Sequence, residues 1–185
     1  GRLRLATGAH DAARRGPNLC ARLAPAQVDA GTERLRPDPL RPEPDPDLAW
    51  RRISRSGRTV AELLMAQSVL AGVGNVYRSE VLFRHRLSPF TEGRNLKRAS
   101  WRLIWGDLER LMPLGVVTGR IVTVDEQVLD VEAALGRGEV PRLTERSSYV
   151  YKRGGMPCVV CGSKVRTRLV AGRNLFWCGR CQRRR

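Results

Sequence analysis

The sequence predicts a mainly helical protein with a small amount of β structure, in which the helices are followed by a zinc-bound β-hairpin. Three observations predict this class. Amphipathic segments opened by Thr59 and Asn75 fill the middle of the chain. Cysteines in two C-x2-C pairs follow near its end. The net charge of +16 over 185 residues indicates a polyanionic partner, of which nucleic acid is the first candidate.

An anionic membrane is the weaker alternative. No apolar run approaches the roughly 18 residues of a spanning helix, and the start GRLRLATGAHD lacks the apolar core of a signal peptide. Only Lys97, Lys152 and Lys164 are lysines among the 34 basic residues. The simplest interpretation of the excess of arginine is codon bias in a GC-rich genome.

The first segment, GRLRLAT at residues 1–7, alternates leucine with arginine, which is the period of a half-buried strand. One strand is not stable alone, so its partners must come from elsewhere. Residues 1–35 are assigned to a first domain. The following run RPDPLRPEPDPD has prolines at 37, 39, 42, 44 and 46, which block helix and central strand. Residues 36–47 are therefore predicted to be a stiff, extended linker.

Residues 48–145 are predicted to form a helical domain. A first helix is expected over Asp47–Ser56. Thr59-Val-Ala-Glu62 is a capping box, and it opens a helix that should end at Gly72 and bury leucines 63, 64 and 70. Asn75 is expected to be the N-cap of a helix that runs to about Arg86.

A further amphipathic helix is predicted over Ser100–Met112. Its apolar face holds Ile104, Leu108, Leu111 and Met112. Residues 115–148 show no dominant period and are predicted to be mostly loop with short elements.

The stretch AGVGN, residues 71–75, separates two of these helices. Gly72 and Gly74 allow the chain to double back with positive φ, and they leave backbone N–H groups uncovered. Asn75 then begins a helix whose free N–H groups suit an anion such as a phosphate. An isolated GxGN is more simply a plain helix–helix turn. In a chain this basic that also holds a zinc module, the phosphate site is favoured.

Four cysteines have the spacing of a four-thiolate zinc site, in which each C-x2-C pair forms one knuckle: Cys158, Cys161, Cys178 and Cys181. Two disulfides are the alternative. They fit poorly, because no secretory signal is present and Cys20 would be left over. Cys20 itself is expected to be a small buried residue. One structural Zn²⁺ is therefore predicted, within a zinc finger over residues 146–185.

The zinc finger contains no Asp or Glu, so all of its charged side chains are positive. KVRTRL reads as a strand with Lys164, Arg166 and Arg168 on one face. A turn is expected over residues 171–174, with Arg173 near the tip. A hairpin fixed by a metal and carrying only positive charge predicts a phosphate-facing surface.

Two long stretches together carry a family resemblance. LLMAQSVLAGVGNVYRSEVLFRHRLSPF followed by YVYKRGGMPCVVCGSKVRTRLVAGRNLFWCGRCQ closely resembles the C-terminal half of the formamidopyrimidine-DNA glycosylase and endonuclease VIII family, most of all its actinobacterial endonuclease VIII branch. The resemblance implies a helix–two-turn–helix domain, a zinc finger, and a first strand left from an N-terminal β-sandwich. It implies that Asn75 and Arg173 bind DNA phosphates. Residues 115–148 lie where some members carry a loop over the everted base.

The resemblance also implies base-excision repair: removal of oxidised bases and nicking of abasic sites in DNA, by a monomer in the bacterial cytoplasm at the nucleoid. Members of the family attack the sugar with an N-terminal proline amine, beside a glutamate that handles protons. This sequence begins Gly1-Arg2. The amine of Gly1 has no carboxylate beside it, so the 185 residues are expected to hold the DNA-binding half without a catalytic residue.

Two other functions fit part of the sequence. A non-catalytic, zinc-dependent nucleic-acid-binding protein would use the same two modules without chemistry. A ribosomal or RNA-modifying zinc-ribbon protein explains the charge and the cysteines, but not AGVGN with its flanking helices.

Overall fold

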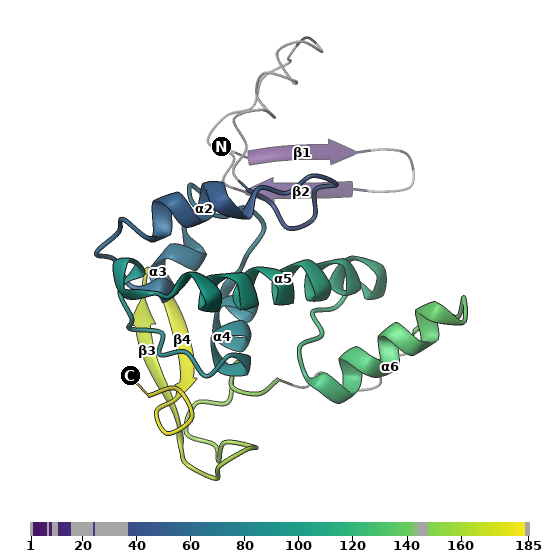
Figure 1. Ribbon diagram of the computed structural model, residues 1–185. Helices are drawn as coiled ribbons and strands as arrows, with labels where there is room; N and C mark the ends of the chain where they lie inside the picture. The colour runs from purple at the N-terminus through teal and green to yellow at the C-terminus, as the bar shows by residue number, and fades with distance from the viewer. Residues whose placement is uncertain are drawn as a thin grey trace. The chain divides into compact units, whose positions relative to one another are not determined.

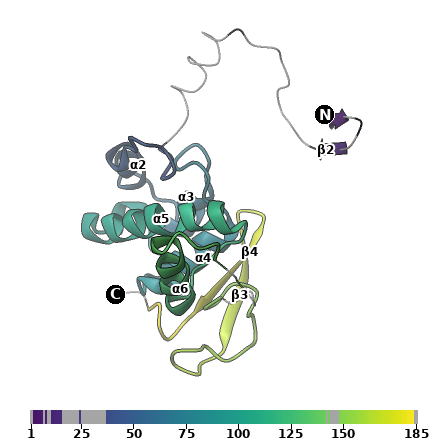
Figure 2. The same cartoon turned by 90° about the vertical axis from the view of Figure 1, so that its right-hand side faces the viewer.

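The computed structural model describes residues 2–6, 8, 11–15, 24, 37–141, 143 and 148–183. The chain divides into two compact units, Gly1–Leu35 and Arg36–Arg185, and each is described by itself. Cys20 lies outside the described residues. Figures 1 and 2 show the elements from two directions.

The first unit contains a two-stranded antiparallel hairpin. Strand β1 (Arg2–Ala6) confirms the strand predicted over residues 1–7, and it pairs with β2 (Asp11–Arg15). Arg2 lies opposite Arg15, and Ala6 lies opposite Asp11. The partner of β1 therefore comes from the next segment of the chain. Membership of this hairpin in a β-sandwich stays a prediction.

The second unit is built from helices and one β-hairpin. The helices are α2 (Pro46–Ile53), α3 (Val60–Met65), α4 (Asn75–Arg84), α5 (Arg98–Thr118) and α6 (Asp125–Gly136), with the short 3-10 helix η1 (Gly93–Asn95) between α4 and α5. The hairpin consists of β3 (Val165–Val170) and β4 (Arg173–Cys178). None of the helices in the described part of the chain has the length and apolar composition needed to cross a membrane.

The proline-rich run is packed at both of its ends. Pro37 and Pro39 are buried, and the backbone carbonyl of Pro37 accepts a hydrogen bond of 3.0 Å from the N–H of Ala71. Pro46 opens α2, where its missing N–H costs nothing, and the Asp45 carboxylate caps the N–H of Leu48 at 2.9 Å. The prediction of a stiff, extended linker is therefore wrong for the two ends of this run. The predicted domain limits remain predictions.

Helix α3 confirms the capping box but is shorter than predicted. The N–H of Thr59 donates to the Glu62 carboxylate at 2.9 Å, while the N–H of Glu62 donates to the Thr59 hydroxyl. The helix ends at Met65, because Ala66 has extended backbone angles, whereas the sequence predicted an end at Gly72.

The prediction that residues 115–148 are mostly loop is wrong. Helix α5 continues through Pro113 to Thr118 and ends where Gly119 takes φ of +64°. Helix α6 then begins at Asp125. Only Val128 and Val131 of α6 are buried, and such a narrow apolar stripe gives a weak period in the sequence.

The hairpin is part of the main hydrophobic core. Leu175 of β4 is fully buried among core residues of the helices, and Val170 and Trp177 pack against that core. The ring of Trp177 meets Phe90 edge to face, with 5.0 Å between centroids. The apolar face of α5 confirms the prediction, since Ile104, Leu108, Leu111 and Met112 are all buried.

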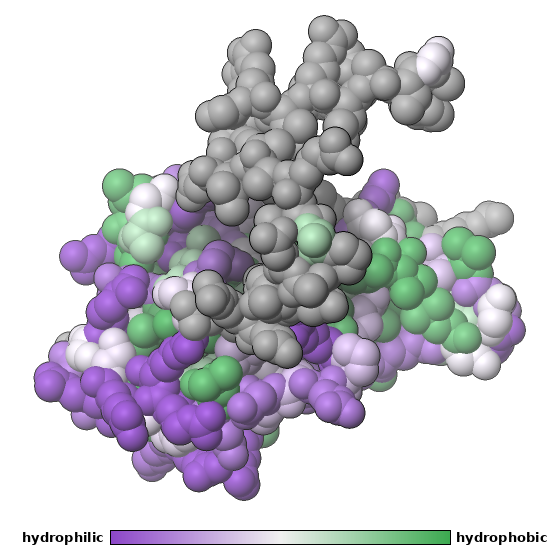
Figure 3. Space-filling view, turned by 90° about the horizontal axis from the view of Figure 1, so that it is seen from above, coloured by the Kyte–Doolittle hydropathy of each residue, from purple (hydrophilic) through white to green (hydrophobic). Residues whose placement is uncertain are grey.

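The surface of the second unit is uneven in polarity. In the space-filling view of Figure 3, hydrophobic residues gather on the right, over the end of α5 and α6, while hydrophilic residues dominate on the left. The exposed apolar side chains there include Val116, Val117 and Leu129.

Candidate nucleic-acid interface and metal centre

The four predicted cysteines form one cluster. Their Sγ atoms all lie within 4.8 Å of one another, with Cys161 and Cys178 separated by 3.5 Å and Cys158 and Cys181 by 4.0 Å. Tetrahedral zinc with Zn–S bonds of about 2.3 Å requires sulfur–sulfur separations of about 3.8 Å. The donor set and its spacing therefore fit the site of one structural Zn²⁺, and all four thiols are free of disulfides.

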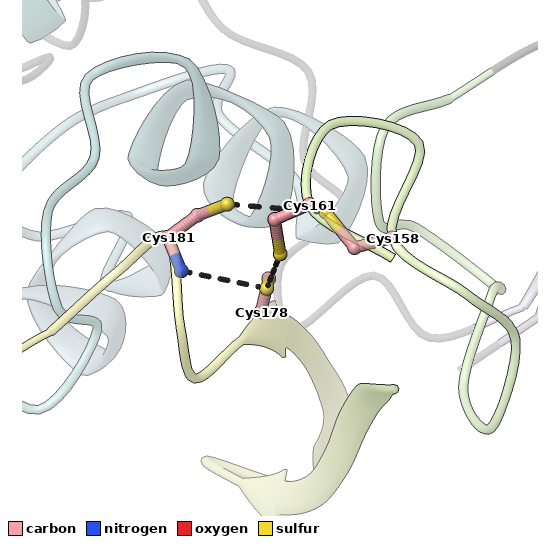
Figure 4. Close-up of side chains that lie close together, drawn as sticks. All are labelled: Cys158, Cys161, Cys178 and Cys181. Carbon is pink, nitrogen blue, oxygen red and sulfur yellow. Dashed lines mark hydrogen bonds between the residues drawn. The ribbon is translucent and has the colours of Figure 1, made fainter. Parts of the chain in front are cut away.

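Two separate loops supply these thiols, as Figure 4 shows. Cys158 and Cys161 belong to the loop before β3, whereas Cys178 ends β4 and Cys181 follows it. Inside the second knuckle the N–H of Cys181 donates to the Cys178 sulfur at 3.5 Å. Hydrogen bonds from Ser163 lower the pKa of Cys161 to about 6, whereas burial raises the pKa of Cys178 and of Cys181, so the case for the metal rests on the geometry of the four thiols. The metal would thus close the open end of the hairpin.

The other end of the hairpin is a tight turn. Val170 pairs with Arg173, so only Ala171 and Gly172 form the turn, with φ of +51° and +72°. Positive φ at both positions is typical of a type I′ turn. The predicted turn over residues 171–174 is therefore too long, because Arg173 and Asn174 already belong to β4. Arg173 is exposed beside the tip, as the sequence predicted.

The AGVGN stretch forms a turn that α5 and Gln67 constrain. Gly72 has φ of +76°, and a Cβ there would lie 2.9 Å from the methyl group of Met112. Gln67 accepts a hydrogen bond of 3.1 Å from the N–H of Gly72 and donates one of 2.9 Å to the carbonyl of Val73. Gln67 was not singled out from the sequence, since a glutamine carries no local signal for a role in a turn.

The turn departs from the prediction in two respects. Gly74 has φ of −110°, so only Gly72 takes positive φ. Gly74 is also the N-cap of α4, because its carbonyl accepts the first helical bond, from the N–H of Arg78, at 2.9 Å. Asn75 is therefore the first helical residue and not the cap. The N–H groups of the first turn of α4 still lack a carbonyl one turn earlier.

The side chain of Asn75 joins the turn to the hairpin. Its Nδ2 donates a hydrogen bond of 2.9 Å to the backbone carbonyl of Asn174, and its Oδ1 accepts one from the guanidinium of Arg78. One of the two Nδ2 hydrogens remains without a described partner. The structure thus brings Asn75 and Arg173 to one place, although 98 positions separate them in the sequence.

The buried side chain of Arg78 supports the contact between the turn and the hairpin. It is fully buried, and its guanidinium also donates to the carbonyls of Val170 at 3.2 Å and Arg173 at 3.4 Å. Burial, and then the charge of Arg173, lower the pKa of Arg78 to about 10, so it remains a cation at neutral pH. We name the group Asn75, Arg78, Arg173 and Asn174 the tip clamp. Arg78 could not be distinguished in the sequence from the many surface arginines.

Glu80 connects α4 to the chain that enters the zinc finger. Its carboxylate is fully buried and accepts hydrogen bonds of 2.8–2.9 Å from the N–H groups of Tyr149, Val150 and Tyr151. The Thr123 hydroxyl also donates to it, at 2.9 Å. Four donors satisfy this charge, and no ion pair among the described residues involves it.

Gln182 makes a second connection on the zinc side. It is buried, accepts a hydrogen bond of 2.9 Å from the N–H of Cys178, and donates one of 3.0 Å to the carbonyl of Leu87. The zinc end of the hairpin is therefore tied to the segment that follows α4.

The other basic residues predicted to bind phosphate lie away from the tip clamp. Arg168 is in the middle of β3, with its guanidinium over the ring of Phe90 at 5.7 Å. Arg166 and Lys164 lie toward the zinc end. All three are exposed. The hairpin thus carries positive charge along its whole length and not at one point.

Comparison with known proteins identifies both modules. Residues 35–126 match the family described as the formamidopyrimidine-DNA glycosylase H2TH domain, and residues 155–184 match the zinc finger found in FPG and IleRS. Endonuclease 8 1 of Mycobacterium tuberculosis is 44% identical over 91% of this chain and 60% of its own length. Formamidopyrimidine-DNA glycosylase of Thermus thermophilus is 34% identical over 80% of this chain and 54% of its own length.

Solved structures give the same result. The crystal structure of the formamidopyrimidine-DNA glycosylase of Thermus thermophilus matches with a TM-score of 0.68 and 28% identity, over 97% of this chain and 67% of that one. A complex of the Lactococcus lactis enzyme with DNA that contains an abasic site matches with a TM-score of 0.67 and 22% identity, over 88% of this chain and 57% of that one. The chain therefore spans little more than half the length of most of these relatives.

Proposed function

Because the chain belongs to the formamidopyrimidine-DNA glycosylase and endonuclease VIII family, we propose that it is the DNA-binding part of a base-excision repair DNA glycosylase. The complete protein would remove oxidised bases and nick the resulting abasic sites as an AP lyase. It would act as a monomer on DNA in the bacterial cytoplasm, at the nucleoid. The ligand proposed for the 185 residues is duplex DNA that contains a damaged or abasic nucleotide.

The tip clamp is the observation that carries this proposal. The first turn of α4 offers free N–H groups and the positive end of the helix dipole, and Asn75 adds its remaining Nδ2 hydrogen. Arg173 stands exposed beside them, with no ion-pair partner among the described residues. A guanidinium can bind two phosphate oxygens at once. Two neighbouring phosphates of one strand would therefore be held between the double turn and the finger tip.

Gly72 and Gly74 contribute through the backbone. Gly74 places no side chain over the start of α4, and a Cβ at this position would meet nothing within 4 Å. An anion can therefore approach the N–H groups there closely. The N–H of Gly72 is already bonded to Gln67, so Gly72 shapes the turn and is not itself a donor to the phosphate.

No catalytic residue is assigned within residues 37–183. The family resemblance places the sugar-attacking amine and its glutamate at a protein N-terminus, and the tip clamp contains neither group. The tip clamp is therefore proposed to bind DNA without forming a covalent intermediate. Its zinc ion would be structural, since four thiolates leave no open coordination position.

Two measurements on the 185-residue polypeptide test the proposal. Fluorescence anisotropy with a labelled duplex should show binding that is tighter when the duplex contains a tetrahydrofuran abasic-site analogue than when it is undamaged. Borohydride treatment of the complex with true abasic DNA should trap no adduct within residues 37–183, because trapping requires a Schiff-base amine. Equal affinity for both duplexes would favour a general nucleic-acid-binding protein. An adduct mapped within residues 37–183 would refute the assignment of no catalytic residue there.

A further inference from the structure

A basic hollow lies at the zinc end of the hairpin, away from the tip clamp. Its volume is about 520 Å³, and its lining consists of Ser163, Lys164, Arg166, Gly179, Arg180 and Arg183. We name it the zinc-end hollow. Four of these six residues are cationic, and the described finger, residues 148–183, contains no Asp or Glu.

The cations of the hollow differ in their pairing from several arginines of the helical surface. Four exposed arginines there have carboxylate partners: Arg94 with Glu92, Arg98 with Asp47, Arg110 with Glu132 and Arg137 with Glu139. Arg102, exposed on α5, has no such partner among the described ion pairs. No described ion pair involves any of the four cations of the hollow. A zinc ion with four thiolates carries a charge of about −2, which offsets only part of their charge. The hollow therefore attracts a further anion.

The shape of the hollow depends on the absence of a side chain at Gly179. A Cβ at this position would lie 2.9 Å from Cζ and 3.0 Å from Nε of Arg166. The guanidinium of Arg166 thus lies against the bare backbone of the second knuckle. Lys164 and Arg166 come from the first half of the finger, and Arg180 and Arg183 from the second, so the zinc site between the two halves fixes their separation.

The hollow and the tip clamp lie at opposite ends of the hairpin. Arg166 pairs with Trp177 toward the zinc end, and Val170 pairs with Arg173 beside the tip. Between them Leu175 and Trp177 pack on the helical core, so a duplex would contact the two ends and not the face between them. Val165 and Val170 bound the strand, and five steps of about 3.4 Å give roughly 17 Å between the two ends. Phosphates of one duplex recur every 3.4 Å or so along the axis of each strand, so a single DNA molecule can reach both sites.

We propose that the zinc-end hollow binds a second segment of the phosphate backbone of the duplex that the tip clamp holds. Guanidinium groups favour phosphate over other anions because they match its oxygens in pairs. Once the clamp is bound, the second contact is intramolecular, so even a weak site adds affinity. This inference rests on the proposed DNA-binding function, and it assigns to Arg180 and Arg183 a role beyond the tip clamp.

The test uses a series of duplexes with a tetrahydrofuran abasic-site analogue at a fixed place and arms of about three to ten base pairs on either side. Wild-type affinity should rise in a step when one arm exceeds about five base pairs, the length that spans roughly 17 Å. In Arg180→Gln/Arg183→Gln the step should disappear, with about a tenfold loss on long duplexes and none on the shortest. Gly179→Ala should reduce the step without any change of charge, because its Cβ displaces Arg166.

Arg94→Gln/Arg137→Gln is the matched control, since it removes the same charge from paired arginines on the helices. An equal loss of affinity in the control, or an equal loss on all arm lengths, would show that the hollow contributes only to the overall positive electrostatic field of the protein. A lower zinc content in Arg180→Gln/Arg183→Gln would show that these cations serve the thiolates, and this too would overturn the inference. If wild type binds no duplex of the series, the proposed function fails and not the hollow alone.

Discussion

The amide of Asn75 donates a hydrogen bond of 2.9 Å to the backbone carbonyl of Asn174, and this contact joins the double turn to the tip of the zinc finger. The two groups that the sequence identified as separate phosphate ligands therefore form one site. Arg78 reinforces the joint by donating to the Asn75 side chain and to the carbonyls of Val170 and Arg173. Changes on either side of the joint should consequently affect the other.

Asn75→Ala should weaken DNA binding by about 1–3 kcal/mol, because it removes an anion contact and the support of the hairpin tip. The loss should be similar for all DNA sequences, since phosphates carry no sequence information. Hydrogen exchange of the Asn174 region should become faster. Asn95→Ala is the control, because that side chain is exposed on η1. Unchanged affinity in a folded Asn75→Ala protein would show that AGVGN is only a turn between two helices and does not bind phosphate.

Arg173→Ala should cost more affinity than Lys164→Ala, Arg166→Ala or Arg168→Ala, because only Arg173 stands beside the start of α4. The slope of log affinity against log salt should fall by about one unit for the loss of one phosphate contact. Zinc content should stay unchanged, since Arg173 lies at the far end of the hairpin from Cys178. A salt titration of each variant on one labelled duplex measures this. Coincident slopes at equal affinity would contradict it.

Removal of zinc should release the hairpin but leave the helices in place. The purified protein should contain about one zinc ion per chain, and chelation or Cys158→Ser should abolish this. Because Leu175 and Trp177 pack on the helical core, their release should change tryptophan fluorescence and lower the melting temperature of the helices. Far-UV circular dichroism should retain the helical signal. Disulfides without zinc, found by mass spectrometry, would refute the metal site.

Glu80→Gln should destabilise the protein by about 2–3 kcal/mol, because an amide offers one acceptor oxygen to the donors that now share a carboxylate. The N–H groups of Tyr149, Val150 and Tyr151 should lose protection from hydrogen exchange first. Urea unfolding measures the stability, with Glu126→Gln on the exposed surface of α6 as control. Equal midpoints for the two variants would show that Glu80 does not hold the finger.

Asp107 should make the helical core sensitive to acid. Burial raises the pKa of its carboxyl, but the His85 ring, whose Nε2 lies 3.2 Å from the carboxylate, and the hydrogen-bonded Arg84 outweigh burial, and the net pKa lies below the ordinary value of 3.8. A carboxyl with a lowered folded pKa contributes stability that is complete above pH 3.8 and is lost as the pH falls through the folded value. The difference in unfolding free energy between wild type and Asp107→Asn should therefore be constant near neutral pH and shrink below about pH 4. Asp130→Asn, on exposed α6, should show no such change.

Local patterns predicted the parts of this protein that depend on neighbouring residues. The capping box of Thr59 and Glu62, the apolar face of Ser100–Met112 and the four cysteines are all confirmed, because each is set by spacing within a short segment. The end of α3 and the existence of α6 were missed. Beyond α3, the side chain of Gln67 bonds the backbone of the turn, a contact that no local pattern indicates. Helix α6 buries only Val128 and Val131, so its period in the sequence is weak.

The sequence by itself determined the helical class, the metal centre, the basic charge and the identity of Asn75 and Arg173 as candidate ligands. Only the tertiary structure decided that these two residues share one site, that Arg78, Glu80 and Gln182 support it, and that four cations surround a hollow at the zinc end. The physical reason is that periodicity and spacing act over a few residues. The burial of Leu175 against helices that lie about a hundred positions earlier in the chain is what brings the finger to the double turn.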